Sequence, residues 1–163
     1  MAGRAYLPFL EAGAVDVAIV DCLWNGVGES VKIAALCDLF EVNCAAHNYH
    51  GWLGTAICAH FCAAIPNFKV RADGIAVSAI PSRTLVRPIK LDSCSLLAAT
   101  HALQILEVDV DDVPWKDKIV THVPPVVNGV LTLPTGPGWG VDVNEEELAR
   151  HPPLRDAKSG IWK

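Results

Sequence analysis

The order strand, loop, helix occurs twice near the start of the chain, and this repeat is the feature that most limits what the chain can fold into. Short apolar runs followed by helical periodicity predict strands over residues 14–20 and 42–46, and helices over residues 29–40 and 52–65. Strands joined through helices lie parallel, with right-handed crossovers. Residues 3–12 look like the helix of a preceding unit, so the pattern begins in mid-repeat. The fold class is therefore α/β.

Each of these two strands ends in a side chain that could carry chemistry. Asp21 follows the first strand and His47 follows the second. Functional groups of parallel sheets gather at the carboxyl ends of the strands, which makes both residues candidates for a site. The residue types alone leave purely structural roles open. Such an aspartate is more often a helix cap, and a histidine often packs against neighbouring side chains. His50 and His60 are expected to pack or cap.

The charge balance excludes one large class of function. The chain has 163 residues, a net charge of -5 and a pI near 5.6, so it has no basic stripe with which to neutralise nucleic-acid phosphates. The longest apolar stretch, residues 52–66, is too short to span a bilayer, and the N-terminus lacks the order of a signal peptide. We expect one cytoplasmic globular domain without membrane or nucleic-acid partners.

Six cysteines raise the question of disulfides or a metal. Most of them lie inside apolar runs, which favours buried free thiols over the loop-rich spacing of a secreted scaffold. Cys58 and Cys62 lie near His60 on one predicted helix. Zinc needs four convergent ligands, and a histidine at this helical spacing points away from the two cysteines, so a zinc site is disfavoured there.

Residues 69–104 differ in composition from the rest of the chain. They carry five basic and two acidic residues, whereas the remainder carries 8 basic and 16 acidic ones. Such a stretch is long for a structureless loop in a compact domain. We therefore expect three parts: strand–helix units over 1–68, an atypical insertion over 69–104 and a closing part over 105–163. The insertion is interpreted as a retained intron translated in frame, with a genuine surface loop as the alternative.

The closing part has three ordered signals. Residues 105–107 predict a short strand that ends in Glu107, although the acidic run beginning there could be merely solvated. An Asn-Gly pair predicts a two-strand ribbon over residues 126–133. Asn144 followed by Glu147 has the spacing of a capping box, which predicts a helix over residues 145–150.

Five segments, in this order, resemble the closing portion of mandelate racemase and muconate lactonizing enzyme-like members of the enolase superfamily. They are GAVDVAIVD at 13–21, VKIAALCDLFEVNCAAHN at 31–48, AHFCAAIPN at 59–67, ILEVDVDDVPW at 105–115 and GVLTLPTGPGWGVDVNEEELARHPP at 129–153. The resemblance implies a partial TIM-type barrel that comprises strands six to eight. It also implies a C-terminal tail that would pack on a capping domain. The family's two adjacent glycines are replaced here by Gly26-Val27-Gly28, which puts that loop's geometry in doubt.

The resemblance also implies a chemistry, namely removal of the proton alpha to a substrate carboxylate, with Mg²⁺ holding the resulting anion. His47 would be the general base, Asp21 would orient it, and Glu107 would hydrogen-bond a substrate oxygen. Expulsion of a beta-hydroxyl would make the protein a sugar-acid dehydratase, a lyase. Return of the proton would make it a racemase or epimerase.

The family's magnesium ligands belong to barrel strands three to five, and the quoted segments cover none of these. The resemblance therefore implies that the metal ligands and the capping domain are missing from this chain, so we expect it to be inactive as an isolated fragment. Open sheet edges favour low stability and association, and a homo-oligomer is left open. A non-catalytic truncated fragment is the rival interpretation. A third is a small binding module around Trp24, Trp52 and Trp139, which are more often packing residues.

Overall fold

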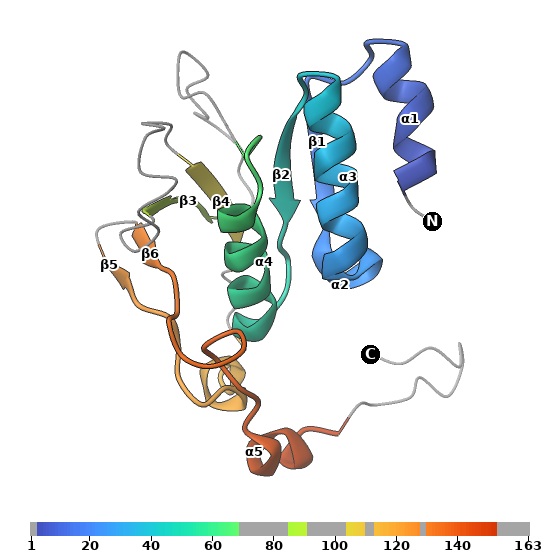
Figure 1. Cartoon of the computed structure of the whole chain (residues 1–163). Helices are drawn as coiled ribbons and strands as arrows, with labels where there is room; N and C mark the ends of the chain where they lie inside the picture. Colours follow the sequence, from blue (N-terminus) through green and yellow to red (C-terminus); the bar gives the residue numbers. More distant parts are fainter. Residues whose placement is uncertain (1–2, 69–84, 91–103, 110–112, 128–129, 153–163) are drawn as a thin grey trace.

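The computed structural model describes residues 3–68, 85–90, 104–109, 113–127 and 130–152 (Figure 1). In chain order, the elements are α1 (Gly3–Glu11), β1 (Val17–Asp21), α2 (Cys22–Asn25), α3 (Val27–Leu39), β2 (Asn43–His47), α4 (Trp52–Ala64), β3 (Leu85–Lys90), β4 (Gln104–Val108), the 3-10 helix η1 (Lys116–Ile119), β5 (Val126–Val127), β6 (Val130–Thr132) and α5 (Glu145–Arg150). The predicted strands and helices occur in the predicted sequence, with boundaries shifted by a few residues, and α2, β3 and η1 are additional elements.

The two repeated units form a parallel pair of strands. β1 pairs with β2 in register from Val17 opposite Asn43 to Asp21 opposite His47. The helix α3 connects the two strands, and α4 follows β2, as expected for a crossover topology. Both helices contact β2, so they lie against the same small sheet (Figure 1). This arrangement brings the carboxyl ends of β1 and β2 to one rim.

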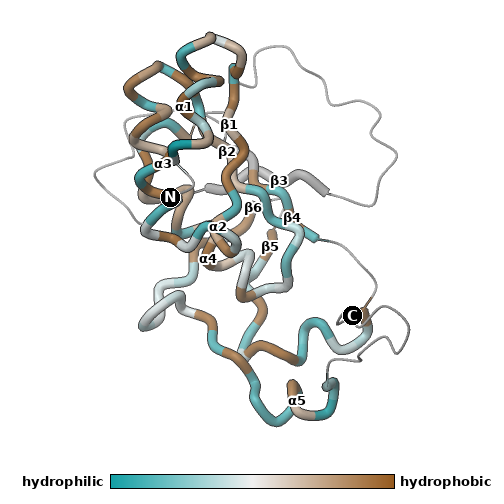
Figure 2. The backbone as a smooth tube through the Cα atoms, turned by 90° about the vertical axis from the view of Figure 1, so that its right-hand side faces the viewer, coloured by the Kyte–Doolittle hydropathy of each residue, from teal (hydrophilic) through white to brown (hydrophobic). Residues whose placement is uncertain are grey.

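The β1 strand has one covered face and one open face. Ala18 and Val20 are buried, whereas Val17 and Ile19 are 40% and 62% exposed. Side chains alternate between the faces of a strand, so the buried pair packs under the helices while the exposed pair faces away from them. The apolar colour along β1 in Figure 2 therefore marks exposed residues as well as buried ones.

A second sheet differs from the expected barrel arrangement. Its strand order is β4-β3-β6-β5, in which β4 is antiparallel to β3 and β3 is parallel to β6. The predicted strand ending in Glu107 is present as β4, but its hydrogen-bonded neighbour is β3, which lies inside the segment 69–104. A third parallel strand hydrogen-bonded to β2 is not seen among the described residues, where the sheet partner of β4 is β3. Leu106 of β4 is nevertheless buried in the same core as β1 and β2.

A short helix that the sequence did not predict follows β1. The Asp21 carboxylate accepts the backbone N–H groups of Leu23 and Trp24 at 2.8 and 2.9 Å, which satisfies two donors at the start of α2. Gly26 separates α2 from α3 with a φ of 75°, a value that a side chain would strain. The region expected to be a loop is therefore two helices joined at Gly26.

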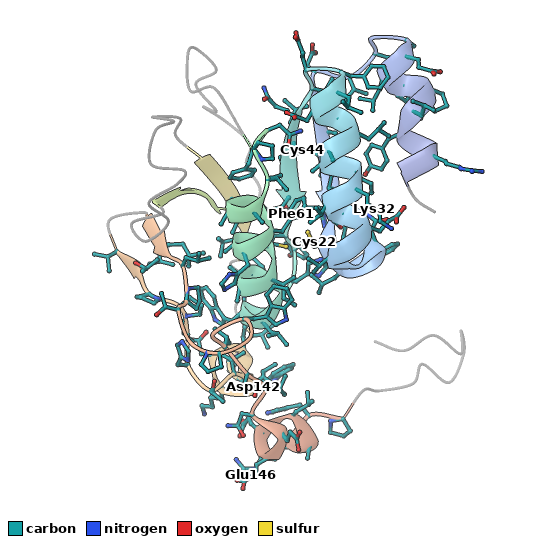
Figure 3. All side chains as sticks on the ribbon, viewed as in Figure 1. Cys22, Lys32, Cys44, Phe61, Asp142 and Glu146 are labelled. Atoms are coloured by element: carbon teal, nitrogen blue, oxygen red, sulfur yellow. The ribbon has the colours of Figure 1, made fainter. Side chains whose placement is uncertain are left out.

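The core is filled by small apolar and cysteine side chains together with a few large ones. Figure 3 labels Cys22, Cys44 and Phe61, which lie between the helices and the strands, and all three are at most 1% exposed. Asn67 follows α4 and joins that end of the helix to α3 and to the start of β2. Its amide nitrogen donates to the carbonyl oxygens of Ala34 and Val42 at 3.0 Å. The buried polar side chain thus satisfies backbone groups of two other elements.

The prediction of buried free thiols is confirmed for the cysteines that the structure describes. Five of the six are free and buried, and Cys94 lies outside the described residues. Burial, followed by the neighbouring Cys37, raises the pKa of Cys44 to about 12. Burial likewise raises the pKa of Cys62 well above its ordinary value. These thiols remain protonated at neutral pH and act as small apolar side chains.

The closing part of the chain forms a smaller apolar cluster of its own. Val120 and Val141 are its buried members together with Ala56 of α4, and Trp52 and Trp139 pack against it. The ribbon β5–β6 is antiparallel as predicted, with the Asn-Gly pair outside the described residues. The described helices are all too short or too polar to cross a bilayer.

The helix α5 begins where the sequence predicted it, although only half of the capping box forms. The Asn144 side chain accepts the N–H of Glu147 at 3.3 Å. The Glu147 carboxylate does not return to the cap, because it binds Arg150 at 2.6 Å and His151 at 3.2 Å. The His151 ring in turn stacks on Trp115 at 4.3 Å, which links α5 to the segment before η1.

Candidate active site

Asp21 and His47 face each other at the carboxyl ends of β1 and β2. They are register partners in the sheet, and Oδ2 of Asp21 lies 3.0 Å from Nδ1 of His47. Their side chains are 19% and 43% exposed respectively, so the carboxylate is mostly covered while the imidazole reaches solvent. The structure brings these two candidate residues together at one rim, with the imidazole on the accessible side.

The two oxygens of Asp21 have different tasks. Oδ1 caps α2, whereas Oδ2 faces the imidazole of His47. Burial acts to raise the pKa of Asp21, but the backbone N–H groups of Trp24 and Leu23 lower it. The nearby His50 and the hydrogen bond with His47 lower it further, and the net shift is downward. Asp21 is therefore an ionised acceptor at neutral pH, and Nδ1 of His47 donates to it.

His50 is a third member of this group, which the sequence analysis did not recognise. Its Nε2 lies 3.5 Å from Oδ2 of Asp21, and its ring meets the His47 ring edge to face at 5.6 Å. The Nε2 atom is buried and has no hydrogen-bond partner. The expectation that His50 merely packs or caps is therefore incomplete. The sequence did contain a signal for this role. His47 and His50 lie three residues apart at the end of one strand, and the neighbouring strand ends in Asp21.

Glu107, the third predicted site residue, reaches the same rim indirectly. Its Oε2 accepts the backbone N–H of Asn48 at 2.9 Å, and its carbonyl oxygen accepts the Asn48 amide at 2.7 Å. Among the described residues, its carboxylate shows no bond to Asp21 or His47. Glu107, on β4, thus binds the residue that follows His47. These two bonds hold the backbone at that position.

Asn48 is the side chain that joins the rim to the rest of the fold. It is fully buried, and its amide nitrogen also donates to Oγ1 of Thr55 at 3.0 Å. Thr55 in turn donates to the carbonyl oxygen of Gly51 at 3.3 Å. These bonds connect the end of β2, the start of α4 and β4, so they set the path of the loop that carries His50.

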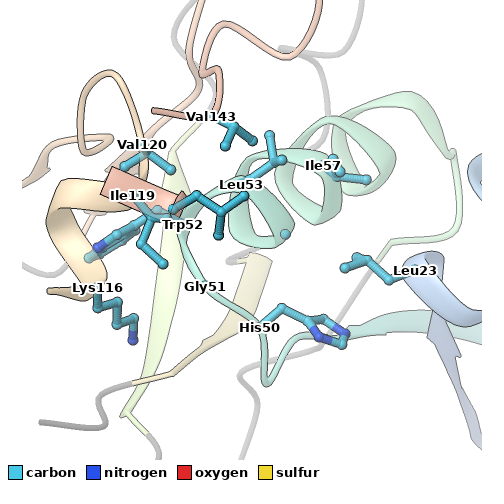
Figure 4. Close-up of a pocket in the computed structure, with 12 residues that line it drawn as sticks. Leu23, His50, Gly51, Trp52, Leu53, Ile57, Lys116, Ile119, Val120 and Val143 are labelled. Atoms are coloured by element: carbon cyan, nitrogen blue, oxygen red, sulfur yellow. The ribbon is translucent and has the colours of Figure 1, made fainter. Parts of the chain in front are cut away.

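A cavity of about 340 Å³ opens beside His50 (Figure 4). Most of its lining is apolar, and the figure shows His50 and Lys116 as the ionisable side chains at its edge. The Lys116 ammonium is paired with the Asp109 carboxylate at 2.9 Å, and it lies 5.6 Å from the Trp52 ring. The lining residues are Leu23, His50, Gly51, Trp52, Leu53, Gly54, Ile57, Lys116, Ile119, Val120, Val143 and Leu148.

The residues at the rim do not fit magnesium. Within the part of the chain that the structure describes, the one cluster with metal-ligand spacing is Asp21, His47 and His50. Mg²⁺ is held by oxygen ligands in near-octahedral geometry, whereas this cluster offers two imidazole nitrogens and a single carboxylate. The chemistry that these three residues can perform is therefore that of their own carboxylate and imidazole groups.

What the pair can do chemically follows from its geometry. With Nδ1 of His47 donating to an ionised carboxylate, the free lone pair lies on Nε2, the outer nitrogen of the ring. Such an imidazole can accept a proton from a bound substrate, and Asp21 then stabilises the imidazolium that forms. The arrangement is suited to general-base catalysis.

Comparisons with known proteins agree with this fold. The family model described as "Enolase C-terminal domain-like" matches residues 4–92 and 71–147. The D-galactarolactone cycloisomerase of Agrobacterium fabrum is 30% identical over 140 residues, which cover 85% of this chain and 30% of that protein. The D-xylonate dehydratase of Haloferax volcanii is 26% identical over 143 residues, which cover 87% of this chain and 26% of that protein.

Solved structures show the same likeness. A Burkholderia xenovorans protein assigned as an L-alanine-DL-glutamate epimerase, solved with magnesium and fumarate, is 40% identical with a TM-score of 0.68. The match covers 93% of this chain and 29% of that one. A mandelate racemase/muconate lactonizing enzyme-like protein from Rubrobacter xylanophilus is 25% identical with a TM-score of 0.62, over 91% of this chain and 30% of that one. The chain thus spans less than a third of the length of each of these relatives.

Proposed function

Because the chain belongs to the enolase C-terminal domain-like family, we propose that His47 and Asp21 are the general base and its orienting carboxylate in a sugar-acid dehydratase-type lyase site. The observation that carries the proposal is the 3.0 Å bond between Nδ1 of His47 and Oδ2 of Asp21. The bond engages Nδ1 and leaves the catalytic task to the opposite nitrogen, Nε2, of a side chain that is 43% exposed. The proton to be removed is the one alpha to the substrate carboxylate.

His47 suits this task because an imidazole ring can hydrogen-bond through one nitrogen and accept a proton on the other. Its side chain is the more exposed of the pair, which gives a substrate access to Nε2. Asp21 is the positioning residue: it holds the tautomer in which Nδ1 carries the hydrogen, and its negative charge favours the protonated ring after transfer. A neutral residue at position 21 would hold the ring less firmly and would lack that charge.

Glu107 is assigned to the same site as the residue that hydrogen-bonds a substrate oxygen. One of its oxygens binds the N–H of Asn48 next to His47. This contact beside His47 supports the assignment, and the second carboxylate oxygen is the atom proposed to bind the substrate. Its bonds to Asn48 also make it a positioning residue for the backbone that follows His47.

The substrate class is drawn from the relatives. Two of them are named as dehydratases of sugar acids, D-xylonate and D-gluconate, and another as a cycloisomerase of a sugar-acid lactone. These substrates or their ring-opened forms carry a carboxylate next to the carbon that loses its proton. Dehydration then requires a beta-hydroxyl as the leaving group. Racemisation or epimerisation is the second candidate, favoured by the 40% identity with the assigned epimerase.

Magnesium is proposed to act in the complete family site, where it would stabilise the enediolate anion. The described rim does not fit that ion, so the 163 residues by themselves are proposed to be inactive. The same chain could then act only as a truncated, non-catalytic fragment or together with other chain segments. Together with such segments, its substrate would be a small carboxylate.

The test joins this chain to a complete site. We would fuse it in place of the matched part of the Agrobacterium fabrum cycloisomerase and follow exchange of substrate alpha-protons in deuterated water by NMR. The fusion should exchange the proton, and His47→Asn should abolish exchange. His122→Asn, a change at an exposed histidine outside the site, should not. Unaltered exchange in an active His47→Asn fusion would exclude His47 as the base.

The free chain is the companion sample in the same assay. Incubated with magnesium and a panel of sugar acids, it should neither exchange protons nor form a keto acid. Product analysis of the active fusion separates the two candidate reactions, because dehydration yields a 2-keto-3-deoxy acid and epimerisation yields an isomer of unchanged mass. Turnover by the free chain that is lost in His47→Asn would refute the proposed inactivity and support the base.

A further inference from the structure

Three potential ligand atoms converge where β1 and β2 end. Oδ2 of Asp21 is 3.0 Å from Nδ1 of His47 and 3.5 Å from Nε2 of His50. One ligand atom from each residue lies within 4.8 Å of the other two. In tetrahedral coordination, ligands about 2 Å from a metal ion lie about 3.3 Å from one another. The two measured separations bracket that value, so small side-chain adjustments would complete the geometry.

The state of His50 is a second, independent observation. Its Nε2 is fully shielded from solvent and has no hydrogen-bond partner. Oδ2 of Asp21 lies 3.5 Å away, within ion-pair distance, but no hydrogen bond joins the two atoms. A shielded polar atom without a partner is unfavourable, and such atoms in folded proteins call for a partner such as an ion. Nε2 of His50 is directed toward the same oxygen that binds His47.

We propose that Asp21, His47 and His50 form a binding site for a divalent transition-metal ion of the zinc class. Asp21 would contribute Oδ2, His47 would contribute Nδ1, and His50 would contribute Nε2. Oδ1 of Asp21 stays on the N–H groups of α2, which fixes the orientation of the carboxylate before any ion binds. The 43% exposure of the His47 side chain leaves an open side, so a water molecule can complete a four-coordinate site.

The donor set selects the class of ion. Imidazole nitrogens suit zinc, cobalt, nickel and copper, whereas magnesium and calcium prefer oxygens. Two imidazoles and one carboxylate are also the protein ligands of many open zinc sites. The rim should therefore bind Zn²⁺ and Co²⁺ and leave Mg²⁺ in solution. This site is distinct from the oxygen-rich magnesium site that the family resemblance implies.

Metal binding has a consequence for the proposed base. In the metal-free pair, the Nδ1 hydrogen of His47 is donated to Asp21, and Nε2 holds the free lone pair. A metal ion on Nδ1 displaces that hydrogen, and a neutral metal-bound ring carries its hydrogen on Nε2. Nε2 then cannot accept the substrate's proton, so the ion would act as an inhibitor. This consequence rests on the proposed function, whereas the binding does not.

The experiment measures binding without any substrate. The purified chain is first freed of metals with a chelator, and the chelator is then removed by buffer exchange. The chain is titrated with Zn²⁺ in a calorimeter, and with Mg²⁺ as a comparison. We expect one Zn²⁺ per chain and no heat of binding with millimolar Mg²⁺. Asp21→Asn and His50→Gln should each weaken Zn²⁺ binding by about tenfold or more. His122→Gln, a change at an exposed histidine, should leave it unchanged.

A direct readout identifies the ligand atoms. In ¹⁵N spectra of the histidine rings, Zn²⁺ should shift Nδ1 of His47 and Nε2 of His50 and leave the ring of His60 unmoved. This measurement uses the unsubstituted chain, so it decides the matter even if a variant fails to fold. Circular dichroism checks the fold of each variant.

Two results would overturn the proposed metal site. The first is Zn²⁺ affinity equal to that of the unsubstituted chain in both folded variants, and the second is a set of ring shifts confined to other histidines. Failure of the proposed function would be seen in another experiment, the fusion assay. There, an active fusion would keep its proton exchange after His47→Asn. The two proposals can therefore fail separately.

Discussion

The Oδ2 atom of Asp21 lies 3.0 Å from Nδ1 of His47 across a register pair of parallel strands. The backbone pairing already brings the two residues opposite each other, and the α2 cap orients the carboxylate through its other oxygen. The backbone register and the α2 cap therefore both help to position the two side chains for this contact. Its direct consequence is a single ring tautomer for His47.

The first prediction concerns this tautomer. In Asp21→Asn, the hydrogen on Nδ1 of His47 loses a charged acceptor, while the asparagine oxygen continues to cap α2. A protected ring N–H resonance of His47, seen by NMR in the unsubstituted chain, should broaden or disappear in the variant. Asp16→Asn, a change at an exposed aspartate before β1, should preserve it. Persistence of the resonance in Asp21→Asn would contradict the assigned hydrogen bond.

The second prediction concerns Asn48, the buried residue that ties the rim to α4 and β4. Asn48→Ala removes the amide's bonds to Thr55 and to the Glu107 carbonyl oxygen, and leaves buried partners unpaired. The free energy of unfolding should fall by about 2–4 kcal/mol, about 1–2 for each bond. Urea denaturation measures the loss. Asn43→Ala, at a half-buried position of β2, the strand that precedes Asn48, should cost less, and equal losses would refute the special role of Asn48.

The third prediction compares two glycines of the PGWG segment. Gly138 and Gly140 have φ values of 64° and 69°, so alanine is strained at both, by about 1–2 kcal/mol. A Cβ at Gly140 would also lie 2.5 Å from Cβ of Pro134, whereas one at Gly138 would meet no atom within 4 Å. Gly140→Ala should therefore cost about 1–3 kcal/mol more than Gly138→Ala in thermal unfolding. Equal costs would show that the loop relaxes away from Pro134.

The fourth prediction concerns pH. The hydrogen bond with His151 lowers the pKa of Glu147 below its ordinary 4.5, an effect that burial opposes and Arg150 assists. Because the folded pKa is lower than the unfolded one, the carboxylate stabilises the fold above about pH 4.5, and this contribution is lost as the pH falls through the folded pKa. The difference in the free energy of unfolding between the unsubstituted chain and Glu147→Gln should be largest near neutral pH and should disappear at acidic pH.

Denaturant midpoints of the two proteins at several pH values test this prediction. Glu146→Gln is the control, since Glu146 precedes Glu147 on α5 and is exposed. Its stability gap should vary less with pH across the same range. A Glu147→Gln gap that widened as the pH fell would reverse the assigned direction of the pKa shift.

The fifth prediction concerns the segment 69–104, which we propose is an addition to a family-like sequence. β4 already contacts β2 through the bonds between Glu107 and Asn48, so it does not depend on β3 alone for its position. A chain in which Phe68 continues directly to Ile105 should fold cooperatively, with β4 free to pair with β2. Thermal melting of the shortened chain measures this. Loss of the folded state on deletion would make the segment an integral part of the fold.

The origin of the same segment can be tested separately. If it is a retained intron, messages lacking the codons for residues 70–104 should be found by sequencing transcripts. If every spliced message keeps those codons, the segment is an exon and the intron interpretation is wrong. The folding experiment and the transcript experiment address different properties and need not agree.

Much of the fold was predictable from local patterns. The helices after Asp21 and His47, the ribbon β5–β6 and the start of α5 all follow from periodicity or turn chemistry within a few residues. The short helix α2 was missed although a capping role for Asp21 was weighed, because its four residues are too few to show a helical periodicity. The pairing of β4 with β3 was missed, because the composition of 69–104 gave no strand signal strong enough to outweigh its unusual charge.

The sequence by itself determined that Asp21 and His47 end neighbouring parallel strands, since strand and helix periodicities act over short stretches and their alternation admits few topologies. Only the tertiary structure decided that His50 turns its shielded nitrogen toward Asp21 and that Glu107 binds Asn48. Those contacts depend on loop paths and on packing between residues far apart in the chain, which no local pattern encodes.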